Sequence, residues 1–140
     1  MTRIMILEDD MDFAEMLKMD LVHHGYEVDV TDSGNEAFEL LSQQDYDLLI
    51  ADIYIWKDGQ VARDGGLLLT GRLQNIRVSN EKDRRGSLPI IVISGAARRP
   101  GQHHILDVAK SLGADAVLAK PFAPEDLHNM IDRLLASYRP

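Results

Sequence analysis

The stretch Asp47-Leu48-Leu49-Ile50-Ala51-Asp52 decides the fold of this chain. Its four central apolar residues follow one another without alternation, which is typical of a strand buried on both faces of a parallel sheet. Asp52 stands directly at the carboxyl end of this strand. Open α/β sheets bind their ligands outside the carboxyl ends of their strands. We therefore expect Asp52 to lie at the centre of an active site.

Four other segments carry strand patterns. Continuous apolar character predicts buried strands, whereas alternation of polar and apolar residues predicts a strand that is half exposed at a sheet edge. The buried candidates are residues 4–7 and 89–93, the alternating candidate is Glu27–Thr31, and residues 116–119 are expected to form the last strand.

Helical patterns separate these strands. Apolar residues recur there at intervals of three and four, the spacing of one helix face. The predicted helices cover residues 11–23, a segment that starts at the capping-box sequence Ser33-Gly34-Asn35-Glu36, and residues 67–76, 102–112 and 124–137. Phe13, Leu17 and Leu21, with Met16 beside them, form the expected inner face of the first helix.

Five alternating strands and helices predict an α/β fold, in which right-handed crossovers place helices on both faces of a parallel sheet. The doubly wound, flavodoxin-like strand order 2-1-3-4-5 suits this chain, because it places the alternating strand Glu27–Thr31 at an edge. Two further segments are expected to be loops. Residues 53–66 form a long loop at the ligand-binding edge, and residues 78–88 form an exposed polar loop at the opposite edge.

The composition excludes several classes of protein. The chain has 140 residues and a net charge of −8, from 23 acidic and 15 basic residues; this suits one domain and argues against direct nucleic-acid binding. The absence of cysteine excludes disulfide and thiol chemistry. No apolar segment approaches the ~20 residues that cross a bilayer, and the N-terminus lacks a signal-peptide pattern. We therefore expect a cytoplasmic protein that does not bind a membrane.

Polar groups follow four of the predicted strands where each strand ends. They are Glu8 and Asp9, then Asp52, Ser94 and Lys120. Parallel strands end at one edge of the sheet, so these groups should converge. Three carboxylates in one place repel one another unless a cation joins them, and Mg²⁺ is a hard cation that prefers oxygen ligands. A lysine and a hydroxyl could hold phosphoryl oxygens, and Asp52 could act as the nucleophile of a phosphoryl transfer.

With these groups at its strand ends, the chain resembles, over essentially its whole length, the CheY-like receiver domain of two-component response regulators. The matching motifs are Ile6-Leu7-Glu8-Asp9-Asp10, Leu49-Ile50-Ala51-Asp52, Ile91-Val92-Ile93-Ser94-Gly95-Ala96, and Gly113-Ala114-Asp115-Ala116 followed by Lys120-Pro121-Phe122. The resemblance implies a phosphorylation-switched protein-binding module. We expect a single receiver domain over residues 1–140, acting as a phosphoacceptor with at most slow self-dephosphorylation rather than as an enzyme.

The resemblance also implies roles for individual residues. Asp52 would accept phosphate from a sensor histidine kinase or a histidine phosphotransfer protein, and a downstream protein partner would sense the change. Mg²⁺ would be held by Asp9, Asp52 and the backbone carbonyl of Tyr54, with Glu8 acting through water. Ser94 and Lys120 would contact the phosphoryl group, and the peptide bond that joins Lys120 to the following proline would be cis.

Two features depart from the family pattern. The aromatic switch residue that usually stands three positions before the lysine is replaced by Val117. The segment after Asp52 is longer than usual, lacks the family's Met-Pro, and carries Tyr54, Trp56 and Arg63. Trp56 is expected to be a local packing anchor, with contact to a partner as the alternative.

Other functions compete with this interpretation. A Mg²⁺-dependent phosphohydrolase could use Asp52 as nucleophile, but that class usually has a second acid where this chain has Tyr54. A flavin-binding electron carrier would need a phosphate-binding loop where this chain has Glu8 and Asp9, which would repel phosphate. A receiver-like scaffold without a switch is the remaining alternative. His23 and His24 at the end of the first helix are expected to be solvated, since no other metal-ligand type clusters with them along the sequence.

Overall fold

The computed structural model describes residues 2–53, 56–57, 60–61, 65–79, 83–95 and 105–138. Five strands form one parallel sheet in the order β2-β1-β3-β6-β7, which is the predicted order 2-1-3-4-5. These strands are β1 (Arg3–Leu7), β2 (Glu27–Thr31), β3 (Leu48–Asp52), β6 (Ile90–Ser94) and β7 (Ala116–Ala119). The helices are α1 (Met11–His23), α2 (Gly34–Gln43), α3 (Gly66–Ser79), α4 (Ile105–Ser111) and α5 (Pro124–Tyr138), with a short 3₁₀ helix, η1 (Arg84–Ser87).

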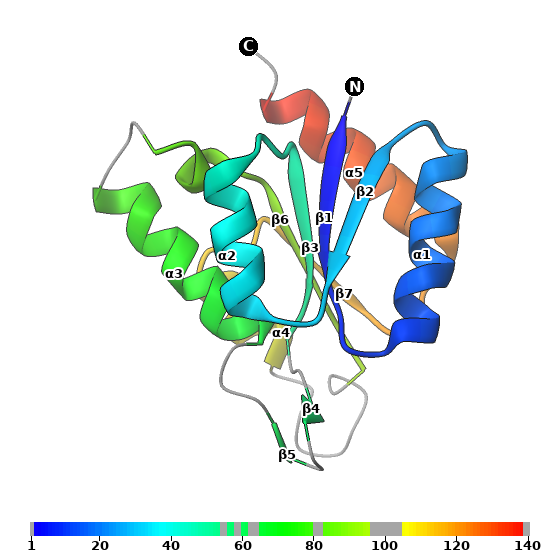
Figure 1. The fold of residues 1–140 in the computed structure, drawn as a ribbon, viewed down its shortest axis with the longest axis horizontal. Coiled ribbons are helices and arrows are strands. Elements are labelled where there is room, and N and C mark those ends of the chain that lie inside the picture. Colours follow the sequence, from blue (N-terminus) through cyan, green and yellow to red (C-terminus); the bar gives the residue numbers. More distant parts are fainter. Residues whose placement is uncertain are drawn as a thin grey trace.

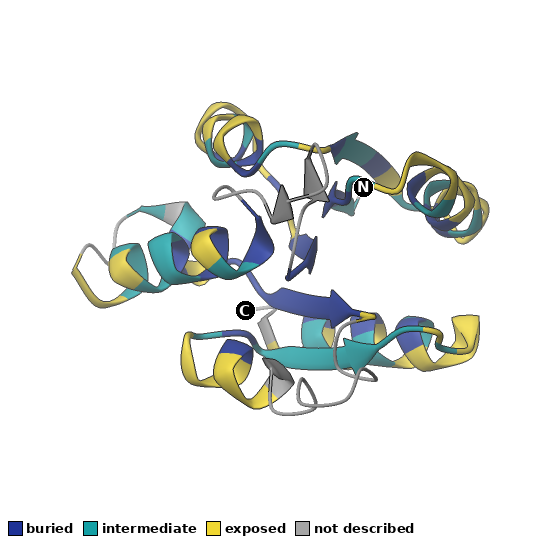
Figure 2. Ribbon diagram, turned by 90° about the horizontal axis from the view of Figure 1, so that it is seen from below, coloured by how far each residue is buried: buried dark blue, intermediate teal, exposed yellow. Residues whose placement is uncertain are grey.

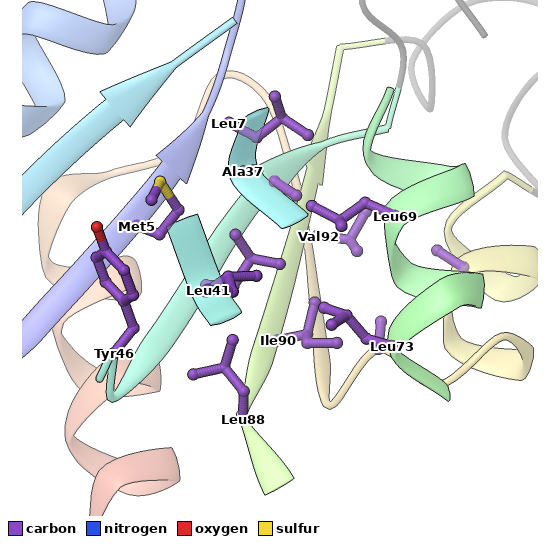
Figure 3. Close-up of a cluster of buried hydrophobic side chains, with 14 of the residues drawn as sticks. Met5, Leu7, Ala37, Leu41, Tyr46, Leu69, Leu73, Leu88, Ile90 and Val92 are labelled. Atoms are coloured by element: carbon purple, nitrogen blue, oxygen red, sulfur yellow. The ribbon is translucent and has the colours of Figure 1, made fainter. Parts of the chain in front are cut away.

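The helices cover both faces of the sheet and bury a separate apolar cluster on each (Figures 1 and 2). Helices α1 and α5 pack on one face, where side chains such as Leu21, Ile50 and Ile131 are fully buried. Helices α2, α3 and α4 cover the other face; Figure 3 shows this cluster, with Leu73 of α3 packed near Ile90 of β6. Burial on both faces explains why the central strands are continuously apolar.

The register of the strands aligns their carboxyl ends. Leu7 lies beside Ala51, Asp52 beside Ile93, and Ser94 beside Ala119. Residues that directly follow β1, β3, β6 and β7 therefore meet at one edge, as the sequence predicts. We call this edge, at the bottom of Figure 1, the carboxyl edge.

Local sequence signals set the helix ends. The Asp10 side chain accepts a hydrogen bond from the backbone N–H of Phe13 at 3.1 Å and caps α1. Ser33 caps α2 by accepting from the N–H of Glu36 at 3.2 Å, which confirms the predicted start of that helix. Gly25 and Gly113 follow α1 and α4 with φ of 96° and 114°, backbone conformations that favour glycine.

Three expectations require correction. Met16 of α1 is 60% exposed, so it does not belong to the inner face. Segment 78–88 is not an exposed loop throughout, because α3 continues to Ser79, and Leu88 is buried in the core. Within 53–66, β4 (Trp56–Lys57) pairs antiparallel with β5 (Gln60–Val61), so part of the expected loop is a short hairpin (Figure 1). None of the helices in the described residues has both the length and the hydropathy that a membrane span needs.

Candidate functional site

Glu8 occupies the most enclosed position of the carboxyl edge. It follows β1, and its backbone N–H donates to the carbonyl of Thr31 at 3.0 Å, which extends the pairing with β2 by one residue. Its side chain is fully buried. The carboxylate accepts hydrogen bonds from the backbone N–H groups of Asp9 and Asp10, at 3.0 and 3.4 Å. The chain therefore turns from β1 into α1 around this carboxylate.

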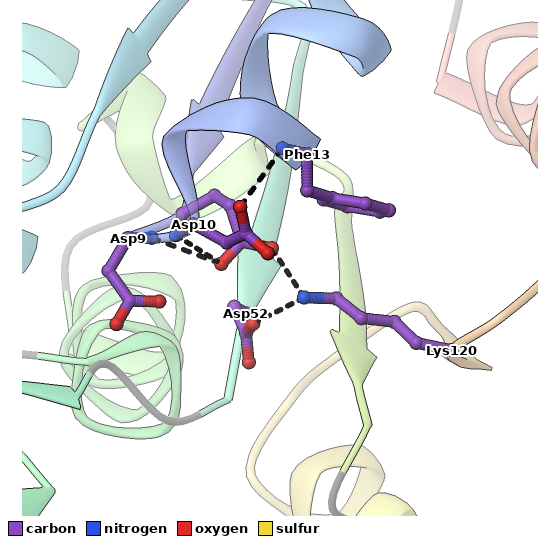
Figure 4. A network of polar contacts seen from close by, with 6 residues as sticks. Asp9, Asp10, Phe13, Asp52 and Lys120 are labelled. Carbon is purple, nitrogen blue, oxygen red and sulfur yellow. Dashed lines mark hydrogen bonds and ion pairs between the residues drawn. The ribbon is translucent and has the colours of Figure 1, made fainter.

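Lys120 joins Glu8 to Asp52. Its Nζ donates to Oδ2 of Asp52 at 2.7 Å and to Oε1 of Glu8 (Figure 4). Asp52 is only 7% exposed, at the end of β3. The Nζ also lies 4.4 Å from the centre of the Phe13 ring, which packs edge-on against Phe122. Glu8 after β1, Asp52 of β3 and Phe13 of α1 thus surround the lysine that follows β7.

Burial and the neighbouring charges shift the acid–base properties of this cluster. Burial, together with the charge of Asp52 and the hydrogen bond to it, raises the pKa of Glu8 from 4.5 to about 8, although Lys120 opposes this. Burial alone would lower the pKa of Lys120, but the hydrogen bonds and charges of Asp52 and Glu8 outweigh it and raise that pKa. Near neutral pH, the lysine is therefore charged and Glu8 is largely protonated.

Asp9 completes a set of three carboxylates. It lies on the opposite side of Asp52 from Lys120 in Figure 4. One oxygen from each of Glu8, Asp9 and Asp52 lies within 4.8 Å of the others. Oxygen donors at this spacing suit a hard divalent cation. Burial is the main cause of the raised pKa of Glu8, and the charge of Asp52 adds to it; a cation at the site would offset this second contribution.

The remaining predicted site residues fall into two groups. Ser94 ends β6 at 1% exposure, and its carbonyl accepts a hydrogen bond from the backbone N–H of Lys120 at 3.0 Å. The Lys120–Pro121 peptide bond is cis, as the resemblance implies. Tyr54 and Arg63 lie outside the described residues. The structure therefore brings Ser94 to the same edge as Asp52, while the carbonyl assigned to Tyr54 stays a prediction.

Two contacts near the site were not predicted from sequence. Gly66, the first residue of α3, lies so close to Asp52 that a β-carbon there would stand 2.1 Å from the Asp52 carbonyl oxygen. In the sequence, the glycines at 65–66 were visible only as the end of the expected loop 53–66. Val117, in the switch position, pairs with Val92 in the sheet and packs against the apolar cluster under α2, α3 and α4.

Comparison with known proteins identifies the family. The family described as "Response regulator receiver domain" matches residues 4–132. The chain belongs to this family: it is a receiver domain of two-component response regulators. The fold, the motifs at the strand ends and the acid cluster agree with this assignment.

Individual relatives agree with the family. The response regulator SaeR of Staphylococcus aureus (strain USA300) is 30% identical over 135 residues, which are 96% of this chain and 51% of SaeR. The chain therefore spans about half the length of the curated relatives that it matches.

Solved structures show the same architecture. The receiver domain of TorR, the TMAO respiratory system response regulator, has a TM-score of 0.77 at 27% identity and covers 99% of this chain and 100% of its own. TrrA of Thermotoga maritima, solved in complex with Mg²⁺-BeF, has a TM-score of 0.73 at 26% identity and covers 96% of this chain and 99% of its own.

Proposed function

We propose that Asp52 is the phosphoacceptor of this receiver domain and that its phosphorylation switches the binding of a downstream protein. The observation that carries the proposal is the 2.7 Å contact between Oδ2 of Asp52 and Nζ of Lys120, made beside the carboxylates of Glu8 and Asp9. This contact gives a nucleophilic oxygen a neighbouring cation at the edge of the sheet where α/β folds bind ligands.

The chemistry proposed for Asp52 is a simple displacement. A carboxylate oxygen of Asp52 forms a bond to phosphorus while the phosphorus–nitrogen bond of a donor phosphohistidine breaks. The imidazole keeps the electron pair and takes up a proton from water. Lys120, already between the two acids, would contact an oxygen of the transferred group, and the Ser94 hydroxyl would donate to another.

Mg²⁺ is the cofactor that the acid cluster fits. Asp9 and Asp52 would bind it directly, Glu8 would act through water, and the Tyr54 carbonyl would be a further ligand. When bound, the ion neutralises negative charge and orients phosphoryl oxygens. The solved structure of TrrA in complex with Mg²⁺-BeF supports this part of the proposal by analogy.

The proposed partners follow from the family. The phosphoryl donor is a sensor histidine kinase or a histidine phosphotransfer protein, and the output is a protein that distinguishes phosphorylated from unphosphorylated Asp52. Because the family match runs over residues 4–132, we propose that residues 1–140 form one receiver domain. The protein is thus a phosphoacceptor switch and not a catalyst of repeated turnover.

Phosphorylation with a small-molecule donor tests the assignment of Asp52. Incubation with acetyl phosphate and Mg²⁺ should add one phosphoryl group by intact-mass spectrometry, and Asp52→Asn should abolish the addition. Asp47→Asn is the matched control, because Asp47 precedes the same strand at its other end and accepts a hydrogen bond from the Arg3 backbone. Equal labelling of the Asp52 variant, or loss of labelling only in the Asp47 variant, would overturn the assignment.

A further inference from the structure

A second group of potential metal ligands lies between α1 and α5. It consists of Asp20 from α1, His24 directly after that helix, and His128 from α5. Asp20 is nine residues beyond the start of α1, so the group lies roughly 14 Å along that helix from the carboxyl edge, at 1.5 Å per residue. It shares no residue with the cluster of Glu8, Asp9 and Asp52.

Helices α1 and α5 hold these three side chains in place. His24 caps the carboxyl end of α1, four positions after Asp20, and its backbone N–H still donates to the Asp20 carbonyl at 3.2 Å, so the two residues lie on the same face of this helix end. Contacts on either side fix the two helices relative to each other: Phe13 packs against Phe122, with ring centres 6.0 Å apart, and Tyr26 donates to Asp132 at 3.3 Å. Phe122 precedes α5 and Tyr26 follows α1, so the two pairs stand on either side of the ligand group along both segments of the chain.

The group is already connected by hydrogen bonds. Nε2 of His128 donates to Oδ2 of Asp20 at 2.6 Å, and Nδ1 of His24 donates to the Asp20 carbonyl at 3.2 Å. The two imidazole rings lie 3.8 Å apart between centres. A histidine that donates from Nδ1 to a backbone carbonyl keeps the lone pair on Nε2 in its neutral form, and this is the arrangement of many metal-binding histidines.

The donor spacing is close to what a tetrahedral metal needs. One ligand atom from each of Asp20, His24 and His128 lies within 4.8 Å of the others. Donors that bind an ion at about 2.0 to 2.2 Å lie roughly 3.3 to 3.6 Å apart. Side-chain movements of about an ångström would therefore suffice, with the ion replacing the proton between His128 and Asp20.

We propose that Asp20, His24 and His128 form a second metal site, which takes a divalent transition-metal ion of the Zn²⁺ class. Two imidazoles and one carboxylate suit Zn²⁺, whereas Mg²⁺ prefers oxygen ligands alone. The chain has no cysteine that would compete for the ion. A bound ion would cross-link α1 to α5 on the face of the sheet that these helices cover, and a fourth position would stay open to water or to a ligand from a partner.

Calorimetric titration with Zn²⁺ in the presence of excess Mg²⁺ tests the site in the full chain. We expect one Zn²⁺ per chain, and Asp52→Asn should leave this binding unchanged because it alters only the other cluster. His24→Ala and His128→Ala should each weaken binding at least about tenfold. His23→Ala is the matched control, because His23 is adjacent to His24 but lies outside the ligand group. This variant should bind Zn²⁺ with the affinity of the unaltered protein.

Two further measurements separate loss of a ligand from loss of the fold. Asp20→Asn keeps the size of the side chain and removes its charge, and should also weaken Zn²⁺ binding while circular dichroism is unchanged. Co²⁺ in place of Zn²⁺ should give visible absorption typical of tetrahedral coordination, and His128→Ala should remove it.

Three results would overturn the proposal. The first is the absence of saturable Zn²⁺ binding when Mg²⁺ is in excess. The second is unchanged affinity in both His24→Ala and His128→Ala. The third is loss of binding only when His103 and His104, which lie outside the described residues, are replaced together. None of these results depends on Asp52 phosphorylation, so failure here leaves the proposed function to be judged by its own test.

Discussion

Replacing Glu8 with glutamine should change how the stability of the metal-free protein depends on pH. Glu8 is fully buried, and its pKa is raised to about 8 from an ordinary 4.5. The folded protein therefore keeps a proton on Glu8 at pH values where the unfolded chain has lost it. Stability is then greatest below about pH 4.5, falls as the pH rises, and levels off above about pH 8. Glutamine resembles the protonated form and cannot ionise.

The size of the effect follows from the displaced pKa. Each pH unit between the two values removes at most about 1.4 kcal/mol of unfolding free energy. Over the whole window from pH 4.5 to about pH 8 the loss is on the order of 5 kcal/mol, and the opposing effect of Lys120 is already contained in the raised pKa. The unaltered protein and Glu8→Gln should thus be most similar near pH 5, and the glutamine variant should gain in relative stability as the pH approaches 8.

Urea denaturation in the presence of EDTA, at intervals from about pH 5 to pH 8, measures this difference. Glu15→Gln is the control, because Glu15 is an exposed glutamate of α1. Saturating Mg²⁺ should reduce the pH dependence, since a cation at the site favours ionised Glu8. Parallel curves for the unaltered protein and Glu8→Gln across this range would show that Glu8 does not carry a raised pKa.

Three substitutions test other parts of the structure. Asp9→Ala should weaken Mg²⁺ binding by at least about tenfold in calorimetry, because it removes both a charge and a ligand; unchanged affinity would exclude Asp9 as a ligand. Gly66→Ala should lower the free energy of unfolding by about 1 to 3 kcal/mol, measured by urea denaturation, because the added β-carbon meets the Asp52 carbonyl. Gly71→Ala should leave this free energy unchanged or raise it, because the space around Gly71 is open. Similar effects at both positions would contradict the close approach of Gly66 to Asp52. Leu73→Ala should cost about 2 to 5 kcal/mol, since Leu73 is 1% exposed in the core, and a loss below about 1 kcal/mol would mean that this core site is not tightly packed.

The parts of the fold that the sequence predicts are those with a repeating pattern. Continuous apolar runs located β3 and the other central strands, and alternation located β2 at the edge. The errors arose where the burial of a single residue could not be inferred from a repeating pattern. Met16 is apolar and adjacent to buried Leu17, but one residue along a helix turns the side chain by about 100°, so Met16 faces solvent. Leu88 is a lone apolar residue in a polar segment and has no periodicity to mark it as buried.

The candidate site was predictable to a similar extent. Parallel strands that end at one edge bring Glu8, Asp52 and Lys120 together regardless of their separation in sequence. The charge state of Glu8 could not be predicted, because it depends on how completely the surrounding chain excludes water. The ligand group at Asp20 was missed for another reason: His128 lies 108 residues away, and no motif connects the two.

The three successive acids after β1 differ in environment although all three carry a carboxyl group. Glu8 accepts from backbone amides and from Lys120, Asp9 lies on the other side of Asp52, and Asp10 caps α1. The order of the three acids therefore determines which of them contacts Lys120, which lies beside Asp52 and which caps α1. Exchanging Glu8 with Asp9 would leave the composition unchanged, yet it would place a shorter side chain opposite Lys120 and a longer one at the half-buried position 9. A designed protein that reproduces this site therefore needs Glu8, Asp9 and Asp10 in this order, and not merely three acidic residues.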